Sequence, residues 1–293
     1  MKLFRGLVVV GLIVAFALAM LGSWTRINGA GMTCPDWPLC RGAVVPVLHG
    51  GVVLEWLHRL LAFCETFVVA ALVVTGLRWR AAIPALVPLL ITLAAAFVLQ
   101  VLLGGVTIFL ANSPLSVMFH WGAATVLLWV LTLLAVVAFV DDPSRPPPTF
   151  AWRPGVAPLL ITIACAFVAM CAGAVVSSSG AGLACPSVPG CDSAFFGQTI
   201  PQALQMTHRL LAAALVLCAV VAVVLLPRSQ RRATVALWVA LVLLAVQITL
   251  GVLNVLWSLP TPLREAHAAN AIATFLAFVV ATAFAALDGD RVA

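Results

Sequence analysis

Four of the five histidines in this sequence of 293 residues lie near one end of four strongly apolar segments. These four are His58, His120, His208 and His267. Two imidazoles that face each other from neighbouring helices can bind a heme iron from both sides. A single histidine of this kind is usually an interfacial side chain, but four at matched positions favour two bis-histidine heme sites.

Other ligands for these histidines fit the sequence less well. Zinc or copper would need further cysteine, histidine or carboxylate ligands at short spacing, and the apolar segments contain few of them. The sequence has no CxxCH motif, which excludes covalently attached c-type heme. Another metal, or simple packing of the imidazoles, remains the alternative.

Two short loops each contain a pair of cysteines. Cys34 and Cys40 lie in "GMTCPDWPLC", and Cys185 and Cys191 lie in "GLACPSVPGC". On the oxidising side of a membrane, pairs with this spacing predict two short-loop disulfides. A structural staple is the simpler interpretation, and a redox or substrate-handling role is an alternative for the first pair.

A carboxylate precedes the first of these histidines. Glu55 lies three residues before His58 and therefore on the same helical face, whereas Gln205 holds the matching position before His208. An ionisable carboxylate near the membrane interior is costly, which makes Glu55 a functional candidate. The alternative is an interfacial glutamate that reaches water or pairs with Arg59.

Glu65 is a second candidate, because it lies seven residues after His58 on the same face and its counterpart, Leu215, is apolar. It is either functional or a protonated glutamate hydrogen-bonded inside the bundle. Arg59 and Arg209 each follow a histidine directly. They could bind the carboxylates of heme propionates, or their side chains could extend to lipid headgroups.

The composition sets the environment of these residues. Of all residues, 64% are hydrophobic and 8% are charged, and the mean hydropathy is +1.20. Since a soluble domain has about 25% charged residues, the chain must be an integral membrane protein. The net charge of +6 comes from arginines in short loops and forms no basic face, which argues against a nucleic-acid partner.

Spanning a bilayer takes about 20 apolar residues in a helix. The sequence predicts eight such helices, at 6–22, 54–77, 84–110, 117–140, 157–176, 204–226, 234–256 and 266–287. The first resembles a signal peptide, but its repeat counterpart at 157–176 lies within the chain, so we predict that it is retained. The fold class is an all-α integral membrane protein.

Positive charges predict the orientation. Ten lysines and arginines fall on one side of the predicted helices: Lys2, Arg5, Arg78, Arg80, Arg145, Arg153, Arg228, Arg231, Arg232 and Arg291. Five fall on the other: Arg26, Arg41, Arg59, Arg209 and Arg264. The positive-inside rule puts both termini in the cytoplasm and the cysteine loops outside the cytoplasmic membrane.

The chain is a duplication of one unit. "HRLLA" at 58–62 recurs at 208–212, and the cysteine pairs recur at an offset of 151. Four helices per unit predict two tandem bundles in one orientation, related by a pseudo-two-fold axis along the membrane normal. The predicted parts are an N-terminal half (1–140), a cytoplasmic linker (141–156) and a C-terminal half (157–293).

The two halves differ in their polar residues. Around its histidines the first half has Arg26, Asp36, Trp37 and Glu55. At these positions the second half has Ser177, Ser187, Val188 and Gln205. This asymmetry predicts one reactive half and one half that only holds a cofactor.

"GAGMTCPDWPLCRG", "EWLHRLLA", the second "HRLLA" and a histidine on each even-numbered helix resemble the heme A synthase family over nearly the whole chain. The resemblance implies an enzyme that oxidises the C8 methyl of heme O to a formyl group, which gives heme A for terminal oxidases. It implies a heme b cofactor on His208 and His267, and substrate heme O on His58 and His120.

Glu55 matches the family's important acidic residue, with a role in stabilising a cationic intermediate or moving a proton. The paired cysteines match the bacterial, disulfide-bearing type, although "CPSVPGC" departs from the "CPDWPLC" form. Expected partners are a heme O-producing farnesyltransferase and an electron-transfer partner. The alternatives are a di-heme b-type cytochrome that takes electrons from quinol, and a heme transporter or chaperone.

Overall fold

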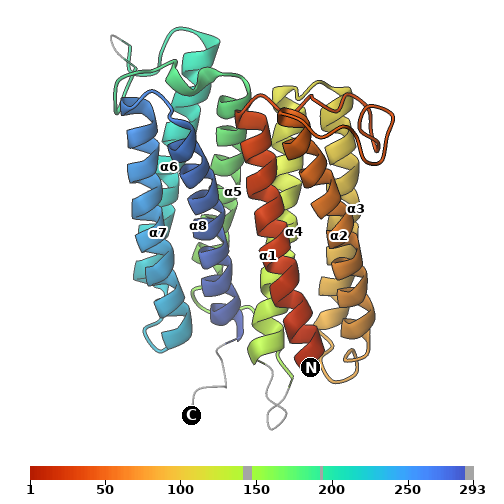
Figure 1. The fold of residues 1–293 in the computed structure, drawn as a ribbon. Coiled ribbons are helices and arrows are strands. Elements are labelled where there is room, and N and C mark those ends of the chain that lie inside the picture. Colours follow the sequence, from red (N-terminus) through yellow and green to blue (C-terminus); the bar gives the residue numbers. More distant parts are fainter. Residues whose placement is uncertain (141–146, 192–193, 288–293) are drawn as a thin grey trace. The chain divides into compact units, whose positions relative to one another are not determined.

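The computed structural model describes residues 1–140, 147–191 and 194–287, and these ranges contain helices and no β-strand. The elements are α1 (Lys2–Ile27), α2 (Gly51–Leu77), α3 (Leu86–Phe109), α4 (Pro114–Val140), α5 (Val156–Ser178), the short 3₁₀ helix η1 (Ala181–Leu183), α6 (Ile200–Leu225), α7 (Arg231–Leu256) and α8 (Thr261–Leu287) (Figure 1). Eight of these described helices are long and apolar enough to cross a membrane. The predicted all-α membrane fold is therefore confirmed.

Several helices begin earlier than their apolar runs predict, because their first turns contain polar side chains. Helix α6 begins at Ile200, before the predicted residue 204. There the Gln202 side-chain oxygen accepts the backbone N–H of Thr199 at 3.1 Å, as in half of a capping box. Hydropathy alone does not detect such a start, because the first turn contains polar residues that form hydrogen bonds and lie outside the apolar run.

The chain divides into two compact units. The first contains residues 1–111, 123–152 and 286–287, and α1 and α2 lie side by side in it (Figure 1). Its core is a set of fully buried apolar side chains on α1 to α4, which includes Phe4, Val8, Leu72, Leu90 and Leu131.

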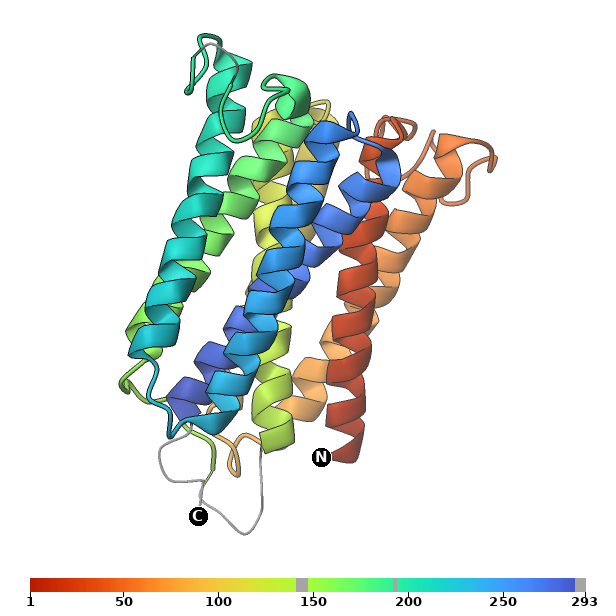
Figure 2. The ribbon, with the colours of Figure 1, turned by 90° about the vertical axis from the view of Figure 1, so that its left-hand side faces the viewer.

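The second unit contains residues 112–122 and 153–285, and its helices α5 and α6 run alongside each other (Figure 2). Phe167 and Phe275 contact each other in its interior with ring centres 6.4 Å apart. The start of α4 belongs to this unit, since Gly122 packs against Phe167 and Cys171.

The division into halves and their pseudo-two-fold relation remain predictions. The first residues of the predicted linker, 141–146, lie outside the described residues, as do Arg145 and Arg291 of the charge count. Residues 147–155 form no helix, which agrees with the proline-rich sequence there.

Gly76 tests the packing of the first unit. A Cβ atom at this position would lie 2.7 Å from Cδ1 of Leu90 and 2.9 Å from Cε2 of Phe4, and both side chains are buried. Gly76→Leu should therefore lower the free energy of unfolding by about 1–3 kcal/mol, as overpacking does. Thermal unfolding in detergent measures this loss. Gly6→Leu is the control, because nothing lies within 4 Å of its Cβ, and equal melting of the two variants would contradict this packing.

Candidate functional site

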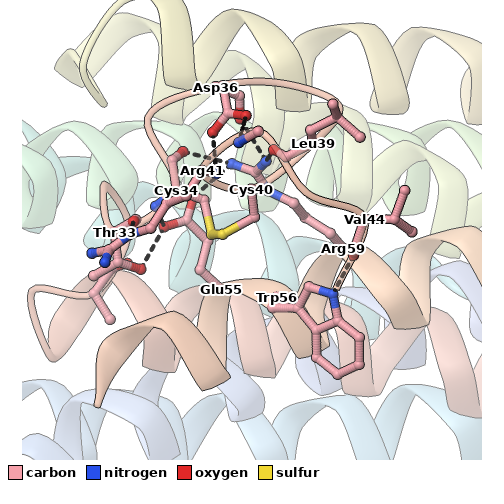
Figure 3. The surroundings of a disulfide bond; sticks show 12 residues. Thr33, Cys34, Asp36, Leu39, Cys40, Arg41, Val44, Glu55, Trp56 and Arg59 are labelled. Carbon is pink, nitrogen blue, oxygen red and sulfur yellow. Dashed lines mark hydrogen bonds and ion pairs between the residues drawn. A yellow bond between two sulfur atoms is a disulfide. The ribbon is translucent and has the colours of Figure 1, made fainter. Parts of the chain in front are cut away.

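A disulfide joins Cys34 and Cys40 in the first cysteine loop, residues 28–50, with the two Cα atoms 4.6 Å apart (Figure 3). The predicted pairing is confirmed. Both cysteines are buried and pack against Val52 and Trp56 of α2. Because a reductant cannot easily reach buried sulfur, the observed geometry agrees with the structural interpretation of this disulfide.

Arg59 fastens the first cysteine loop to α2. Its Nη1 donates to the carbonyls of Asp36, at 2.6 Å, and Leu39. Its Nη2 donates to the carbonyl of Cys34 and to a carboxylate oxygen of Glu55, both at 2.8 Å. These four contacts occupy the four terminal N–H groups of the guanidinium, so the loop folds around this side chain.

Glu55 takes part in the same network and is only 4% exposed. One carboxylate oxygen pairs with Arg59. The other accepts the backbone N–H of Cys34 and the hydroxyl of Thr33, each at 2.9 Å. The ion pair between Glu55 and Arg59, which was one of the two sequence interpretations, is therefore present. Hydrogen-bond donors contact both oxygens of the buried carboxylate.

The second cysteine loop, residues 179–191, repeats this arrangement in the second unit. Cys185 and Cys191 form the predicted disulfide and are buried beside Met206. Arg209 donates to the carbonyls of Cys185 and Ser187 at 2.7 Å, and also contacts the carbonyls of Pro189 and Gly190.

Gln205 stands in for Glu55 in this second network. Its side-chain oxygen accepts the N–H of Cys185 at 2.6 Å, and its amide nitrogen donates to the carbonyl of Gly182 at 2.8 Å. Both residues therefore hold a cysteine N–H in the same way. What distinguishes the two halves at this position is the negative charge of the glutamate.

Further contacts brace the first cysteine loop. The Asp36 carboxylate accepts the backbone N–H groups of Arg41, at 2.5 Å, and Gly42, at 2.8 Å. Both donors have positive φ, a left-handed turn that the carboxylate stabilises. The hydrogen bond from Gly42 is the main cause that lowers the pKa of Asp36 below its usual value. Trp37 lies over Gly105 of α3, where an added Cβ would be 3.1 Å from the indole.

His208 and His267 face each other within the second unit. Their ring centres are 6.5 Å apart and the ring planes are inclined by 78°. Two imidazole–metal bonds of about 2.0 Å, with each ring centre roughly 1.1 Å behind its nitrogen, would place the ring centres about 6.2 Å apart. The observed separation is therefore close to that expected for two imidazoles that would hold one metal ion between them.

Hydrogen bonds orient both imidazoles. Nδ1 of His208 lies 3.0 Å from the carbonyl of Ala169, so Nδ1 carries the proton and Nε2 keeps its lone pair for a metal. The side-chain nitrogen of Gln247 lies 3.2 Å from the ring nitrogens of His267. Asn270 fixes the orientation of that amide by donating to the Gln247 oxygen at 2.9 Å.

His58 occupies the corresponding position on α2 in the first unit, where it is half-buried. Its ring edge lies against Gly22 of α1, where an added Cβ would be 2.9 Å from Cε1. The carbonyl of Leu18 lies near the ring but outside hydrogen-bonding geometry, so Nδ1 is buried with no partner among the described residues. The ring therefore retains unused hydrogen-bonding and ligating capacity.

The remaining predicted residues are His120 and Glu65. His120 is half-buried on α4 and belongs to the second unit, so its pairing with His58 stays a prediction that the repeat supports. Glu65 is fully buried on α2, and neither carboxyl oxygen has a hydrogen-bond partner in the part of the chain that the structure describes.

Sequence reasoning missed several residues around the imidazoles: Gly22, Gly173, Gly251, Gln247 and Asn270. The three glycines each let a helix approach an imidazole closely, with a built Cβ between 2.9 and 3.2 Å from its Cε1. A signal was available, since Gly22 and Gly173 align at the same offset of 151 as the cysteine pairs.

Comparison with known proteins gives one family and several relatives. The family model described as "Cytochrome oxidase assembly protein" (COX15-CtaA) matches residues 5–279. The chain is 26% identical to a heme A synthase of Bacillus licheniformis over 91% of both chains. It is 29% identical to a heme A synthase of Geobacillus thermodenitrificans over 84% of this chain and 80% of the relative. A heme A synthase of Geobacillus kaustophilus is 27% identical over 87% of this chain and 84% of the relative.

Arg59→Lys tests the attachment of the first cysteine loop. Lysine keeps the charge but cannot span the carbonyls of Cys34 and Leu39 with one ammonium group. Reduction of Cys34–Cys40 by a phosphine should become about tenfold faster, because a hydrogen bond from a charged group contributes about 1.5 kcal/mol or more. Mass spectrometry of alkylated peptides measures the rate. Cys185–Cys191 in the same molecule is the control, and equal acceleration of both disulfides would contradict the assignment.

Proposed function

Because the chain belongs to the cytochrome oxidase assembly protein family COX15-CtaA, we propose that it is a heme A synthase, which oxidises the C8 methyl of heme O to a formyl group in a membrane. The observation that carries the proposal is the family match over nearly the whole chain, together with relatives that bear this name. The facing imidazoles of His208 and His267 support it independently of the family.

In this proposal His208 and His267 hold heme b as the cofactor of the second half. Their ring-centre separation of 6.5 Å, and the Ala169 hydrogen bond that leaves Nε2 of His208 unprotonated, suit two side chains that would hold this heme. A bound heme b would supply one-electron transfer. The protein's part is to orient the ligands through Ala169, Gln247 and Asn270 and to keep the site apolar.

The first half binds heme O as the substrate, with His58 and His120 as iron ligands. The methyl group is oxidised in two two-electron steps, first to an alcohol and then to a gem-diol that loses water to leave the aldehyde. Water supplies the oxygen atom and releases two protons in each step, and the proposed electron-transfer partner accepts the two electrons. Glu55 lies within one turn of His58, where its carboxylate stabilises positive charge that develops on the substrate. The hydrogen bonds that hold Glu55 also fix the position of its carboxylate.

Arg59 and Arg209 are proposed to contact the heme propionates. The loop carbonyls and Glu55 use the terminal N–H groups of Arg59, which leaves Nε–H as the donor available to a propionate. Arg209 retains Nε–H and one N–H of Nη2, because among the described residues Nη2 donates to the carbonyl of Cys185 alone. Most N–H groups of both arginines therefore bind the cysteine loops, and the remaining ones are available to a propionate.

The proposed location is the cytoplasmic membrane, with both termini on the cytoplasmic side and the cysteine loops outside. The two disulfides support this orientation, since they persist in an oxidising compartment. Proposed partners are a farnesyltransferase that supplies heme O and a protein that transfers electrons.

Pigment analysis tests the proposal. The protein is purified from membranes of a host that makes heme O, and the extracted pigments are identified by chromatography and mass. Heme b together with heme A or hydroxylated heme O, with or without unreacted heme O, is the expected result. Heme b alone would indicate a di-heme cytochrome, heme O without oxidised products would indicate a transporter or chaperone, and no heme would contradict every heme function.

Glu55→Gln separates the charge of Glu55 from its structural contacts. Gln205 shows that a glutamine can hold the cysteine N–H of such a loop, so the variant should fold and retain its hemes. The formyl product should fall by at least about tenfold, as expected for a lost electrostatic contribution of about 1.4 kcal/mol or more. Product analysis by chromatography, with Gln205→Glu as the matched control, measures the effect. Unchanged conversion would remove Glu55 from the mechanism.

A further inference from the structure

Glu65 is the one buried acidic side chain in the described residues that makes no hydrogen bond. It is 0% exposed, and both carboxyl oxygens lack a partner among those residues. Glu55, the other buried glutamate, has an arginine, a hydroxyl and a backbone N–H around it. An unpaired carboxylate within a membrane-spanning helix is very costly, so Glu65 is best described as a neutral carboxylic acid with one donor and one acceptor to satisfy.

The position of Glu65 connects it with His58. Both lie on one face of α2, seven residues apart, which is about 10 Å along a helix. Below Glu65 the same face closes against α1 and α4, where an added Cβ on Gly11 would lie within 3.5 Å of Val68, Leu72 and Leu131. Along this face of α2, Glu65 is therefore the last polar side chain between His58 and the tightly packed apolar side chains around Leu72.

The matching position of the second unit is apolar. Leu215 lies seven residues after His208 and is buried, so this position is apolar in the half proposed to hold heme b. At this position, therefore, the half that contains His58 has an acidic side chain that needs a hydrogen-bond partner, and the other half does not. In the proposed function this is the half that binds heme O, and the inference rests on that function.

Heme O and heme b differ at one substituent of the porphyrin. Heme O has a hydroxyethylfarnesyl group where heme b has a vinyl group, and its hydroxyl is on the carbon attached to the ring. The charged propionates of either heme favour the aqueous end of the helices, which directs the opposite edge toward the membrane interior. The hydroxyl is therefore a polar group that heme O, and not heme b, would bring to the depth of Glu65.

We propose that Glu65 binds the hydroxyl of the hydroxyethylfarnesyl group and thereby selects heme O over heme b in the first half. A carboxylic acid can donate to this hydroxyl and accept from it at once. With heme b in the same place, the acid would stay buried without a partner. A site built to bind a hydroxyl rejects the analogue that lacks it for this reason.

The test measures which hemes the protein contains rather than its activity alone. The wild type, Glu65→Leu and Glu65→Gln are purified from a host that makes both hemes, and heme O plus its oxidised products is divided by heme b. Glu65→Leu should lower this ratio about five- to tenfold, the effect of one buried hydrogen bond. Glu65→Gln should stay within about twofold of the wild type, because an amide also donates and accepts.

Cys64→Leu is the matched control, since Cys64 is the exposed neighbour of Glu65 and should leave the ratio unchanged. Heme b retained in the second half reports that each variant has folded, and Glu65→Met replaces Glu65→Leu if that variant loses heme b. An unchanged ratio in the apolar variant would overturn the inference. So would an equal loss in Glu65→Gln, because an amide keeps both a donor and an acceptor for the hydroxyl. Wild-type protein that contains heme b alone would contradict the proposed function itself.

Discussion

The attachment of each cysteine loop to a helix by one arginine is the interaction on which the rest of the site depends. Arg59 and Arg209 each donate hydrogen bonds to several loop carbonyls at the end of an apolar bundle. Each arginine directly follows a histidine, so the same helical turn holds the loop and presents an imidazole. The disulfides close a short ring in each loop next to its arginine, and their cysteines are buried.

Duplication preserved this geometry and changed its charge. Glu55 and Gln205 accept the same cysteine N–H, and neither loop needs a carboxylate for that contact. The additional negative charge in the first half therefore requires another explanation, and electrostatic stabilisation of substrate chemistry supplies one. A similar contrast occurs deeper in the membrane, where Glu65 holds the position that Leu215 has in the repeat and its carboxyl oxygens have no hydrogen-bond partner among the described residues.

The imidazoles depend on close helix packing as well as on hydrogen bonds. Gly22, Gly173 and Gly251 leave no side chain between the helix and the ring, so each imidazole is held by a backbone surface. In the second unit a carbonyl and an amide complete the orientation, and the two rings reach a separation that suits one iron. Such a site tolerates little displacement, since both ligands are fixed by neighbouring helices.

Sequence alone determined the eight membrane-spanning helices, the two disulfides and the four histidines. These features depend on composition, local spacing and internal repetition, which are readable along the chain. Tertiary structure decided which groups meet: Arg59 with loop carbonyls, Gln205 as a neutral substitute for Glu55, and glycines against imidazoles. It also left Glu65 without a hydrogen-bond partner in the part of the chain that the structure describes. Which side chains and backbone groups contact each other depends on the rotation of each helix and the path of each loop, and local hydropathy determines neither.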